Sequence, residues 1–466
     1  MIKSSVGNGL VITIGGGSHE REMTLKMTGV PAGYTIRGNK VNEVLAARAP
    51  GKSPLSTPRK ERDLPYLKVN DQWVAVNDQF EFITPEDGVL EFIIRNENYT
   101  SEVYHLELPR PGHADLPAFL KYGNKVNMAG GGPFSGRMTA MYTLAGAVAM
   151  EILKTMGIKV GTSVMSVGDC VGEPVDLLDP AGTAHGLTEA MKEEILKAKA
   201  EKDSVGGVVE GYATGLPVGI GGPMFDGFES LLSPLLLGIP GVKALEFGAG
   251  FKVASMKGSQ DNDDFIEFNN KKIITETNNA GGILGGITTG MPLVFRVALK
   301  ATPSISKVQN TVCISTGEQD SMIIMGRHDP CIVPRGRAVV GAVTAIGILD
   351  GMILGGLIGD NSSCSEEESG FSSNQSDASR ELQKLRDDID AIDQQIVSLL
   401  NQRMEAAKGV AVYKIVHGVA IKDSGREDEI LAKVGDRYKD IYQEIFQASR
   451  KLQQEITDKI KKSSKN

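Results

Sequence analysis

The chain has 466 residues, of which 41% are hydrophobic and 23% charged, and its formal net charge is −8. This composition is typical of a soluble globular protein rather than a fibrous or disordered one, and the length predicts two or three domains. The acidic balance argues against broad binding to nucleic acid or to anionic membranes.

The cysteines and the N-terminus indicate the cellular compartment. No apolar core preceded by basic residues marks a signal peptide at the N-terminus. The cysteines form no CxxC pair and have no zinc-ligand spacing, so neither a disulfide framework nor a metal site is expected. These features predict a reducing, cytoplasmic location. The four cysteines are Cys170, Cys313, Cys331 and Cys364.

A glycine-rich block in the first third of the chain carries the first candidate site. Gly130–Thr139 reads GGGPFSGRMT and precedes an apolar helix expected over Leu144–Ile152. A glycine-rich turn before a helix is typical of an anion-binding loop. The spacing matches neither the GxGxxG pattern of dinucleotide-binding folds nor a P-loop. Alone, the block supports only a weak phosphate-binding hypothesis.

One segment is long and apolar enough to span a bilayer, namely Ala338–Gly359. It contains Asp350 and several glycines, and it follows a charged stretch. We therefore interpret it as a buried core helix of a soluble domain.

Glycine usage divides the chain near residue 360. Only five of the 55 glycines lie at residue 370 or beyond, and the C-terminal part is rich in Glu, Gln, Lys and Leu. Between the two parts, residues 360–377 are polar and acidic, which is typical of a flexible linker. We predict a first domain over 1–359 and a helical domain over 378–466.

The C-terminal domain begins with a long amphipathic pattern. Apolar residues recur at spacings of three and four from Leu382 to Leu399, and no proline occurs from Arg380 to Val416. So long a helix needs a partner chain to cover its apolar stripe. A second helix is expected to begin at Ser424, and a third over Tyr438–Ile460.

Polar side chains interrupt the apolar faces of these helices. Each one alone is best interpreted as part of a solvated face, with Glu427 as a capping residue. The set together resembles the active-site skeleton of the all-α chorismate mutase family. The resemblance rests on LRDDIDAIDQQIVSLLNQR, on the lysine that follows it, on DSGRE and on S-x-x-x-Q.

The resemblance to chorismate mutase implies a role for each of these residues. Chorismate rearranges to prephenate without acid, base or covalent catalysis, so the site must hold two carboxylates and stabilise charge on the ether oxygen. Arg386 and Arg403 are 17 residues apart, about 100° out of phase on one helix, which agrees with a site built from two chains. Arg386 of the partner subunit and Arg403 would bind carboxylates, Lys414 and Gln453 the ether oxygen, Asp423 and Glu427 the substrate hydroxyl, and Arg426 and Ser449 would complete the pocket.

The first part of the chain resembles a second family, chorismate synthase, through many blocks in the same order. The blocks are RPGHAD at 110–115, GGGPFSGRMT, DSVGGVVE at 203–210, NNAGGILGG at 278–286, KATPS at 300–304 and RHDPC at 327–331. The resemblance implies an α+β fold, a β-α-β sandwich, followed here by the small all-α domain. The chorismate mutase resemblance implies that this helical domain forms an intertwined dimer. The chorismate synthase resemblance implies a homotetramer, reduced FMN as cofactor, and removal of phosphate from 5-enolpyruvylshikimate 3-phosphate to give chorismate.

The chorismate synthase resemblance also implies site residues. His113 would assist phosphate departure, His19 would lie near flavin N1, and Asp329 near flavin N5; a structural ion pair is the alternative for Asp329. The residues expected to contact flavin or the substrate phosphate are Ser135, Arg137, Gly286, Lys300, Thr302, Ser304 and Arg327.

The N-terminal motifs depart from the chorismate synthase pattern. Where the family has TFGESHG, this chain has Thr13-Ile-Gly-Gly-Gly-Ser-His19-Glu20, and the arginine-rich stretch is reduced around Arg48. Fewer arginines should bind a phosphorylated substrate more weakly. We expect Arg48, Lys52 and Arg59 to bind the substrate in their place.

These observations predict a bifunctional enzyme, a phosphate lyase joined to an isomerase. No segment resembling a flavin reductase is left over, so an external flavin reductase, with NADP as its nucleotide, is a further expected partner. Two alternatives remain open. The mutase domain is a sensor that regulates an active synthase, or an active mutase is carried on a degenerate synthase scaffold.

Overall fold

The computed structural model describes residues 3–51, 55–56, 63–96, 107–269, 272–326 and 328–358. In the C-terminal part it describes residues 396, 399–400, 403–411, 413–414, 417, 424–434 and 438–463. The chain divides into two compact units, Met1–Cys364 and Ser365–Asn466. The predicted linker, residues 360–377, lies entirely outside the described ranges. The predicted site residues Lys52, Arg59, Arg327, Arg386 and Asp423 also lie outside them.

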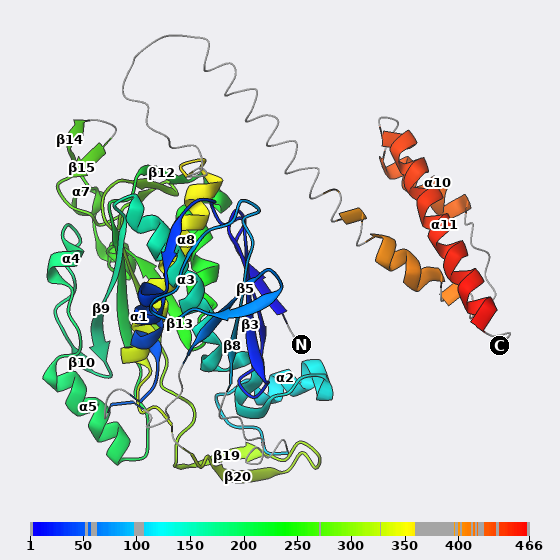
Figure 1. Ribbon diagram of the computed structural model, residues 1–466. Coiled ribbons are helices and arrows are strands. Elements are labelled where there is room, and N and C mark those ends of the chain that lie inside the picture. The colour runs from blue at the N-terminus through cyan, green and yellow to red at the C-terminus, as the bar shows by residue number, and fades with distance from the viewer. Residues whose placement is uncertain are drawn as a thin grey trace, which may run out of the picture. The chain divides into compact units, whose positions relative to one another are not determined.

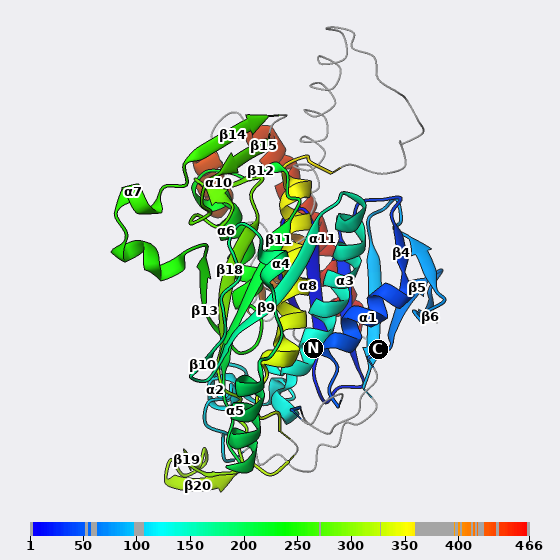
Figure 2. The ribbon, with the colours of Figure 1, turned by 90° about the vertical axis from the view of Figure 1, so that its left-hand side faces the viewer.

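Two antiparallel sheets enclose a layer of helices in the first unit (Figures 1 and 2). The six-stranded sheet has the order β1-β2-β3-β8-β5-β6 and the five-stranded sheet β10-β9-β11-β18-β13. The first sheet comprises β1 (Lys3–Val6), β2 (Val11–Gly16), β3 (Glu22–Thr28), β8 (Leu90–Arg95), β5 (Pro65–Val69) and β6 (Gln72–Ala75). The second comprises β10 (Cys170–Val171), β9 (Lys159–Val167), β11 (Gly207–Thr214), β18 (Leu293–Leu299) and β13 (Val242–Phe247).

The helices between the sheets are α1 (Gly38–Arg48), α3 (Thr139–Thr155) and α8 (Val333–Leu354), and α6 (Phe228–Leu237) packs on α8. Helices α3 and α8 are apolar on almost every side because each contacts the other and strands of the sheets. The architecture confirms the expected β-α-β sandwich.

Helix α8 coincides with the segment that is long enough to cross a membrane. Of the most apolar 18-residue window of this helix, 78% is buried inside the first unit, so the predicted core helix is confirmed. Its charged residue has a structural partner, because the Asp350 carboxylate accepts hydrogen bonds from the backbone N–H groups of Asn8, Gly9 and Leu10 at 2.7–3.1 Å. These bonds compensate the burial of the charge and anchor the β1–β2 turn.

The remaining elements of the first unit lie around the sandwich. In one short sheet, β17 (Ile287–Thr289) lies between β12 (Val218–Gly221) and β16 (Ile283–Leu284). Three two-stranded sheets pair β14 (Phe265–Asn269) with β15 (Lys272–Thr275), β19 (Val308–Val312) with β20 (Gln319–Ile323), and β4 (Thr35–Arg37) with β7 (Glu81–Ile83). The other helices are α2 (Asp115–Tyr122), α4 (Pro180–Thr183), α5 (Glu189–Ala200), α7 (Gly258–Asp261), and the 3₁₀ turns η1 (Gly123–Lys125), η2 (Ala129–Phe134), η3 (Gly136–Met138), η4 (Met224–Asp226) and η5 (Gly250–Ser255).

The second unit is helical throughout its described elements. Helix α10 (Ser424–Val434) and helix α11 (Lys439–Ser463) confirm the second and third predicted helices, and residues 403–411 are also helical. The amphipathic face of α11 buries Phe446, Ser449 and Gln453.

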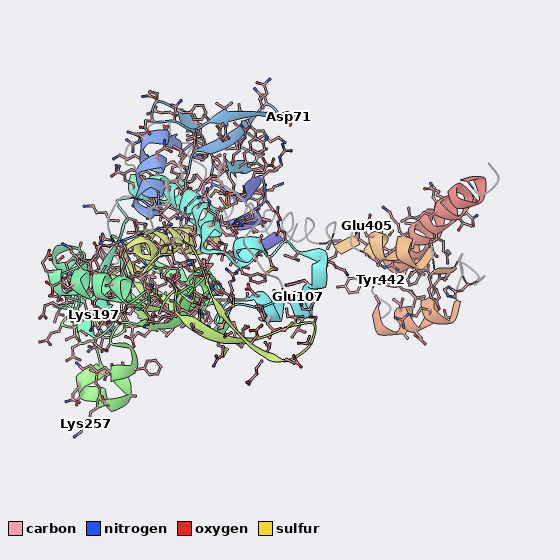
Figure 3. All side chains as sticks on the ribbon, turned by 90° about the horizontal axis from the view of Figure 1, so that it is seen from below. Asp71, Glu107, Lys197, Lys257, Glu405 and Tyr442 are labelled. Carbon is pink, nitrogen blue, oxygen red and sulfur yellow. The ribbon has the colours of Figure 1, made fainter. Side chains whose placement is uncertain are left out.

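Most charged side chains lie at the surface, as Asp71, Lys197 and Lys257 do at the periphery of the first unit (Figure 3). A few charged side chains are buried instead. Burial of a charge without a partner is costly, so the contacts of these side chains indicate where a structural or functional role requires a charge. They are Arg48, Asp63, Arg137, Glu151, Glu210 and Asp350.

Candidate active sites

A large cavity of about 1770 Å³ opens in the described part of the first unit. Its walls come from the loop after β2, the 110–115 loop, the glycine-rich turn, the end of β18 and the segment before α8. The cavity therefore brings together residues that are far apart in the sequence. The predicted site residues that line it are His19, Arg48, His113, Ser135, Arg137, Lys300, Thr302, Ser304 and Asp329.

Among the described residues of the first unit, one predicted site residue does not line this cavity, namely Gly286. It follows the β16 strand and packs against Gly222 and Gly227, and its carbonyl accepts the N–H of Phe228 at 2.8 Å. Within the chain, its observed role is to join the β16–β17 turn to α6.

The glycine-rich turn packs directly on His19. Gly130, Gly131 and Gly132 have φ values of +62°, +91° and +50°, which residues other than glycine rarely adopt. A Cβ atom at Gly130 would lie 2.0 Å from His19 Cε1. The N–H of Ser18 donates to the Gly132 carbonyl at 3.2 Å. The turn thus holds the His19 loop against the cavity wall.

The 110–115 loop is folded around an ion pair. The Arg110 guanidinium donates two hydrogen bonds to the Asp115 carboxylate at 2.7 and 2.8 Å, and the Arg110 backbone N–H donates a third at 3.1 Å. Lys300 Nζ donates to the Gly112 carbonyl at 2.7 Å. These bonds present His113 to the cavity.

His113 has a hydroxyl partner and an unusual acidity. Its Nε2 lies 2.8 Å from Ser304 Oγ. Burial, followed by the charge of Arg110, lowers the pKa of His113 to about 4. The imidazole is therefore neutral at pH 7, and one ring nitrogen is available as an acceptor.

Two buried arginines that line the cavity share one carboxylate. Arg48 Nη1 donates to Asp63 at 2.5 Å, and Arg137 Nη1 donates to the other oxygen of the same carboxylate. Although burial opposes its ionisation, the charges of Arg48 and Arg137 hold the pKa of Asp63 below its ordinary value. Burial lowers the pKa of Arg48 to about 10, so the guanidinium remains charged at pH 7.

Asp329 is in an ion pair and also lines the cavity. Arg335 donates to the Asp329 carboxylate and, through Nε, to the Arg48 carbonyl at 2.9 Å. The sequence had left open a catalytic carboxylate or a structural ion pair for Asp329. The structure shows an ion pair whose carboxylate is fixed at the cavity wall.

The cavity wall offers unsatisfied hydrogen-bonding atoms and a lysine side chain to an anionic ligand. Thr302 Oγ1 and His328 Nε2 are buried and have no hydrogen-bond partner among the described residues. Burial, followed by the charge of Lys243, lowers the pKa of Lys300. Polar groups of this kind are normally satisfied, so the wall fits a phosphate-bearing ligand.

The second unit places several predicted residues together. Arg403 Nη1 donates to Ser449 Oγ at 2.5 Å and its guanidinium lies 5.6 Å from the centre of the Phe446 ring. One turn further along α11, Gln453 Oε1 is buried and has no partner among the described atoms. The Glu427 carboxylate accepts from Arg450 Nη1 at 2.7 Å with each oxygen. Arg426 pairs with Glu429 at 2.7 Å on an exposed face, and Lys414 is half-buried.

Comparison with known proteins identifies the first unit. A family model for chorismate synthase matches residues 10–353. The chain belongs to the chorismate synthase family. The chorismate synthase of Methanocella arvoryzae is 40% identical over 369 residues, which cover 77% of this chain and 96% of that protein. The Methanococcoides burtonii chorismate synthase is 40% identical over 370 residues, covering 77% and 98%.

A solved structure supports the same fold. A crystal structure of chorismate synthase superimposes with a TM-score of 0.56 at 24% identity, covering 76% of this chain and 94% of that one. Beyond the synthase domain, a family model for type II chorismate mutase matches residues 385–454. The chain is therefore an enzyme that joins a chorismate synthase domain to a chorismate mutase domain in the shikimate pathway.

Sequence reasoning missed several residues at the synthase cavity. Lys243, His328 and Arg335 line it, and Asp63 and Asn96 lie behind its wall. His328 lies within the RHDPC block and Arg335 follows shortly after it, and this block is the signal that pointed to the region. Asp63 and Asn96 belong to no motif that carries a recognisable chemistry.

Proposed function

We propose that the first unit eliminates phosphate from 5-enolpyruvylshikimate 3-phosphate with reduced FMN bound in the cavity, and that the second unit rearranges the resulting chorismate to prephenate. The observation that carries the first half is the cavity wall, where a neutral His113 faces a set of buried and half-buried cations. A phosphorylated substrate and a flavin phosphate both require such cations.

The substrate side is assigned to the cations of the arginine wall and to His113. Arg48, with Lys52 and Arg59, binds the phosphorylated substrate. A phosphate group placed beside His113 favours protonation of the ring, and the resulting imidazolium donates a hydrogen bond to the departing phosphate. Ser304, 2.8 Å from Nε2, keeps the ring oriented.

The cofactor side is assigned to the remaining cavity residues. Reduced FMN supplies electron density and a proton-accepting nitrogen to an elimination that has no net redox change. His19 and Asp329 are proposed to lie beside its ring system, at the N1 and N5 positions. The residues proposed to hold its ring or phosphate are the cavity residues Ser135, Arg137, Lys300, Thr302 and Ser304, together with Arg327 from outside the described ranges. Gly286 does not line the cavity and is not assigned to the cofactor.

The mutase site is assigned to the polar residues of the second unit. Arg403, held between Ser449 and the Phe446 ring, binds a substrate carboxylate with Arg386 of the partner subunit. Gln453 and Lys414 contact the ether oxygen, Glu427 and Asp423 the hydroxyl, and Arg426 completes the pocket. The buried Gln453 Oε1, an acceptor without a partner among the described atoms, supports a ligand with a hydrogen-bond donor at this position, and the ether oxygen would accept from Nε2 of the same amide.

The assembly is proposed to be a homotetramer through the first unit, with pairing of the helical units. The described surface of the first unit exposes large apolar side chains, including Met224, Phe225 and Phe251, each more than 80% exposed. Apolar surface of this kind is typical of interaction sites. A cytoplasmic location and an external flavin reductase that uses NADP complete the proposal.

One anaerobic assay tests both activities. The full-length protein is incubated with chemically reduced FMN and 5-enolpyruvylshikimate 3-phosphate, and chorismate and prephenate are measured separately. Formation of prephenate from the phosphorylated substrate supports both halves. Protein that neither retains FMN nor forms chorismate, but rearranges added chorismate, would instead support an active mutase on a degenerate scaffold.

A further inference from the structure

Asp63 lies behind the wall of the synthase cavity rather than on it. Asp63 precedes strand β5 in the chain, and its side chain is 2% exposed. It is not among the residues that line the cavity. Its two oxygens accept hydrogen bonds from Arg48 and Arg137, both of which line the cavity. One carboxylate thus fixes two cations of the site.

On one side, this connection continues to the loop that carries His19. Arg137 Nε donates to Asn96 Oδ1 at 3.2 Å. Asn96 Nδ2 in turn donates to the carbonyls of Gly17 and Glu20, at 3.2 and 2.7 Å. These two carbonyls flank Ser18 and His19, so the conformation of the loop is bonded to the Arg137 guanidinium.

On the other side, the connection reaches Asp329. Arg48 Nε donates to Thr139 Oγ1 at 3.1 Å, and the Arg48 carbonyl accepts from Arg335 Nε at 2.9 Å. Arg335 is paired with Asp329. A continuous chain of hydrogen bonds therefore runs from Asp329 to the His19 loop, and Asp63 is its midpoint.

Charge explains why the midpoint must be a carboxylate. Two guanidinium groups beside each other repel, and each is costly to bury without an anion. A single carboxylate that accepts from both compensates the burial and fixes the planes of both guanidinium groups. The excess positive charge of the trio remains available to an anionic ligand.

We propose that Asp63 is a positioning residue of the synthase site. From behind the wall it fixes Arg48 and Arg137 for a phosphate monoester and, through Asn96, holds the loop of His19. The inference rests on the proposed function, in which the phosphate belongs to the substrate or to FMN.

Full-length Asp63→Asn tests the proposal, because the change keeps the shape of the side chain and removes its charge. We expect the dissociation constant of 5-enolpyruvylshikimate 3-phosphate, measured by calorimetry with oxidised FMN present, to rise about tenfold or more. A separate FMN titration, followed by flavin fluorescence, shows whether the flavin phosphate is affected as well. Anaerobic kcat/KM should fall, and Asp63→Glu should restore part of the loss.

Glu210→Gln provides the matched control. Glu210 is fully buried, accepts from Arg296 Nε and from the Val175 N–H at 2.9 Å each, and does not line the cavity. The same chemical change there should lower the melting temperature and leave both dissociation constants unchanged. Equal binding losses in the two variants would overturn the proposal.

A second variant covers the case in which Asp63→Asn does not fold. Asn96→Ala leaves both arginines on Asp63 but releases the His19 loop, so kcat should fall more than substrate affinity. Unchanged kcat, KM and dissociation constants in Asp63→Asn, or in Asn96→Ala if only that variant folds, contradict the inference. Wild-type protein that binds both ligands but forms no chorismate contradicts the proposed function instead, and the binding comparison still decides the role of Asp63.

Discussion

At the scale of single residues, His113 shows how burial sets a protonation state. Its pKa lies at about 4, against an ordinary value of 6.5, because it is buried and then because Arg110 is close. Between these two values the unfolded chain binds a proton that the folded chain excludes. His113 therefore increases the free energy of unfolding, and so stabilises the fold, as the pH rises from about 4 to 6.5.

We expect His113→Gln to flatten this part of the stability profile. The single tryptophan, Trp73, lies in strand β6 of the first unit, so its fluorescence reports unfolding of that unit during urea titrations at several pH values. His185→Gln serves as the control of opposite sign. Both ring nitrogens of His185 face carbonyl oxygens, at 2.9 and 2.7 Å, and these bonds raise its pKa, so its stabilisation is lost as the pH rises. Identical slopes in wild type and His113→Gln would contradict the assigned pKa.

Arg403 gives the corresponding prediction for the mutase unit. Arg403→Ala removes the guanidinium that donates a hydrogen bond to Ser449 Oγ at 2.5 Å. We expect the rate of chorismate rearrangement to fall at least about a hundredfold. Circular dichroism should show unchanged helix content. Lys408→Ala is the matched control, since among the described residues Lys408 pairs with the exposed Glu405 on the same helix. Near-wild-type turnover in Arg403→Ala would show that the site is assigned wrongly.

The site residues that the sequence predicted differ from those that it did not predict in how they contribute to the site. His113, Ser304, Lys300 and Asp329 lie in ordered blocks, and the structure places all of them at one cavity. Asp63 and Asn96 act through contacts with groups from distant elements. No local pattern encodes such contacts, so their role becomes visible only in three dimensions.

At the scale of elements, the glycine-rich turn shows the same limit. Its composition indicated an anion-binding loop, and its position before helix α3 was as expected. What the sequence could not show is that Gly130 faces the His19 ring, because the two residues belong to different elements. The absence of a side chain there is needed for packing as well as for the left-handed backbone.

We expect Gly130→Ala to displace His19 and to lower the rate of the elimination, because its Cβ would lie 2.0 Å from His19 Cε1. Gly356→Ala is a close control. Gly356 has φ of +63°, close to that of Gly130, so both variants place an alanine in the left-handed region. Among the described residues, no atom beyond the chain neighbours of Gly356 lies within 4 Å of its Cβ position. Anaerobic synthase assays should show a loss in Gly130→Ala alone, and equal activities would show that the contact with His19 has no functional role.

At the scale of the whole molecule, the fall in glycine content near residue 360 predicted two domains. The structure divides at residues 364 and 365, a few residues beyond the predicted end of the first domain. The change in composition lies near this division, and a turn-rich sandwich and a helical unit need different residues. Composition contains no information about how two separate units are arranged, so it predicted the parts and not their assembly.

The division into two compact units predicts that the two activities can be removed separately. His113 belongs to the first unit and Arg403 to the second, and each is proposed to act only within its own site. His113→Ala should therefore fail to convert 5-enolpyruvylshikimate 3-phosphate but should rearrange added chorismate at the wild-type rate. Arg403→Ala should show the reverse behaviour and accumulate chorismate from the phosphorylated substrate.

Anaerobic time courses that resolve chorismate from prephenate measure both quantities in the same sample. An equimolar mixture of the two variants should restore the conversion of 5-enolpyruvylshikimate 3-phosphate to prephenate, since chorismate released by one molecule can reach the mutase unit of another. A synthase rate that falls in Arg403→Ala would contradict independence and favour the alternative in which the mutase unit senses its ligand and regulates the synthase. Adding chorismate to wild type then separates the cases, because a sensor alters the elimination rate when its ligand binds and an independent enzyme unit does not.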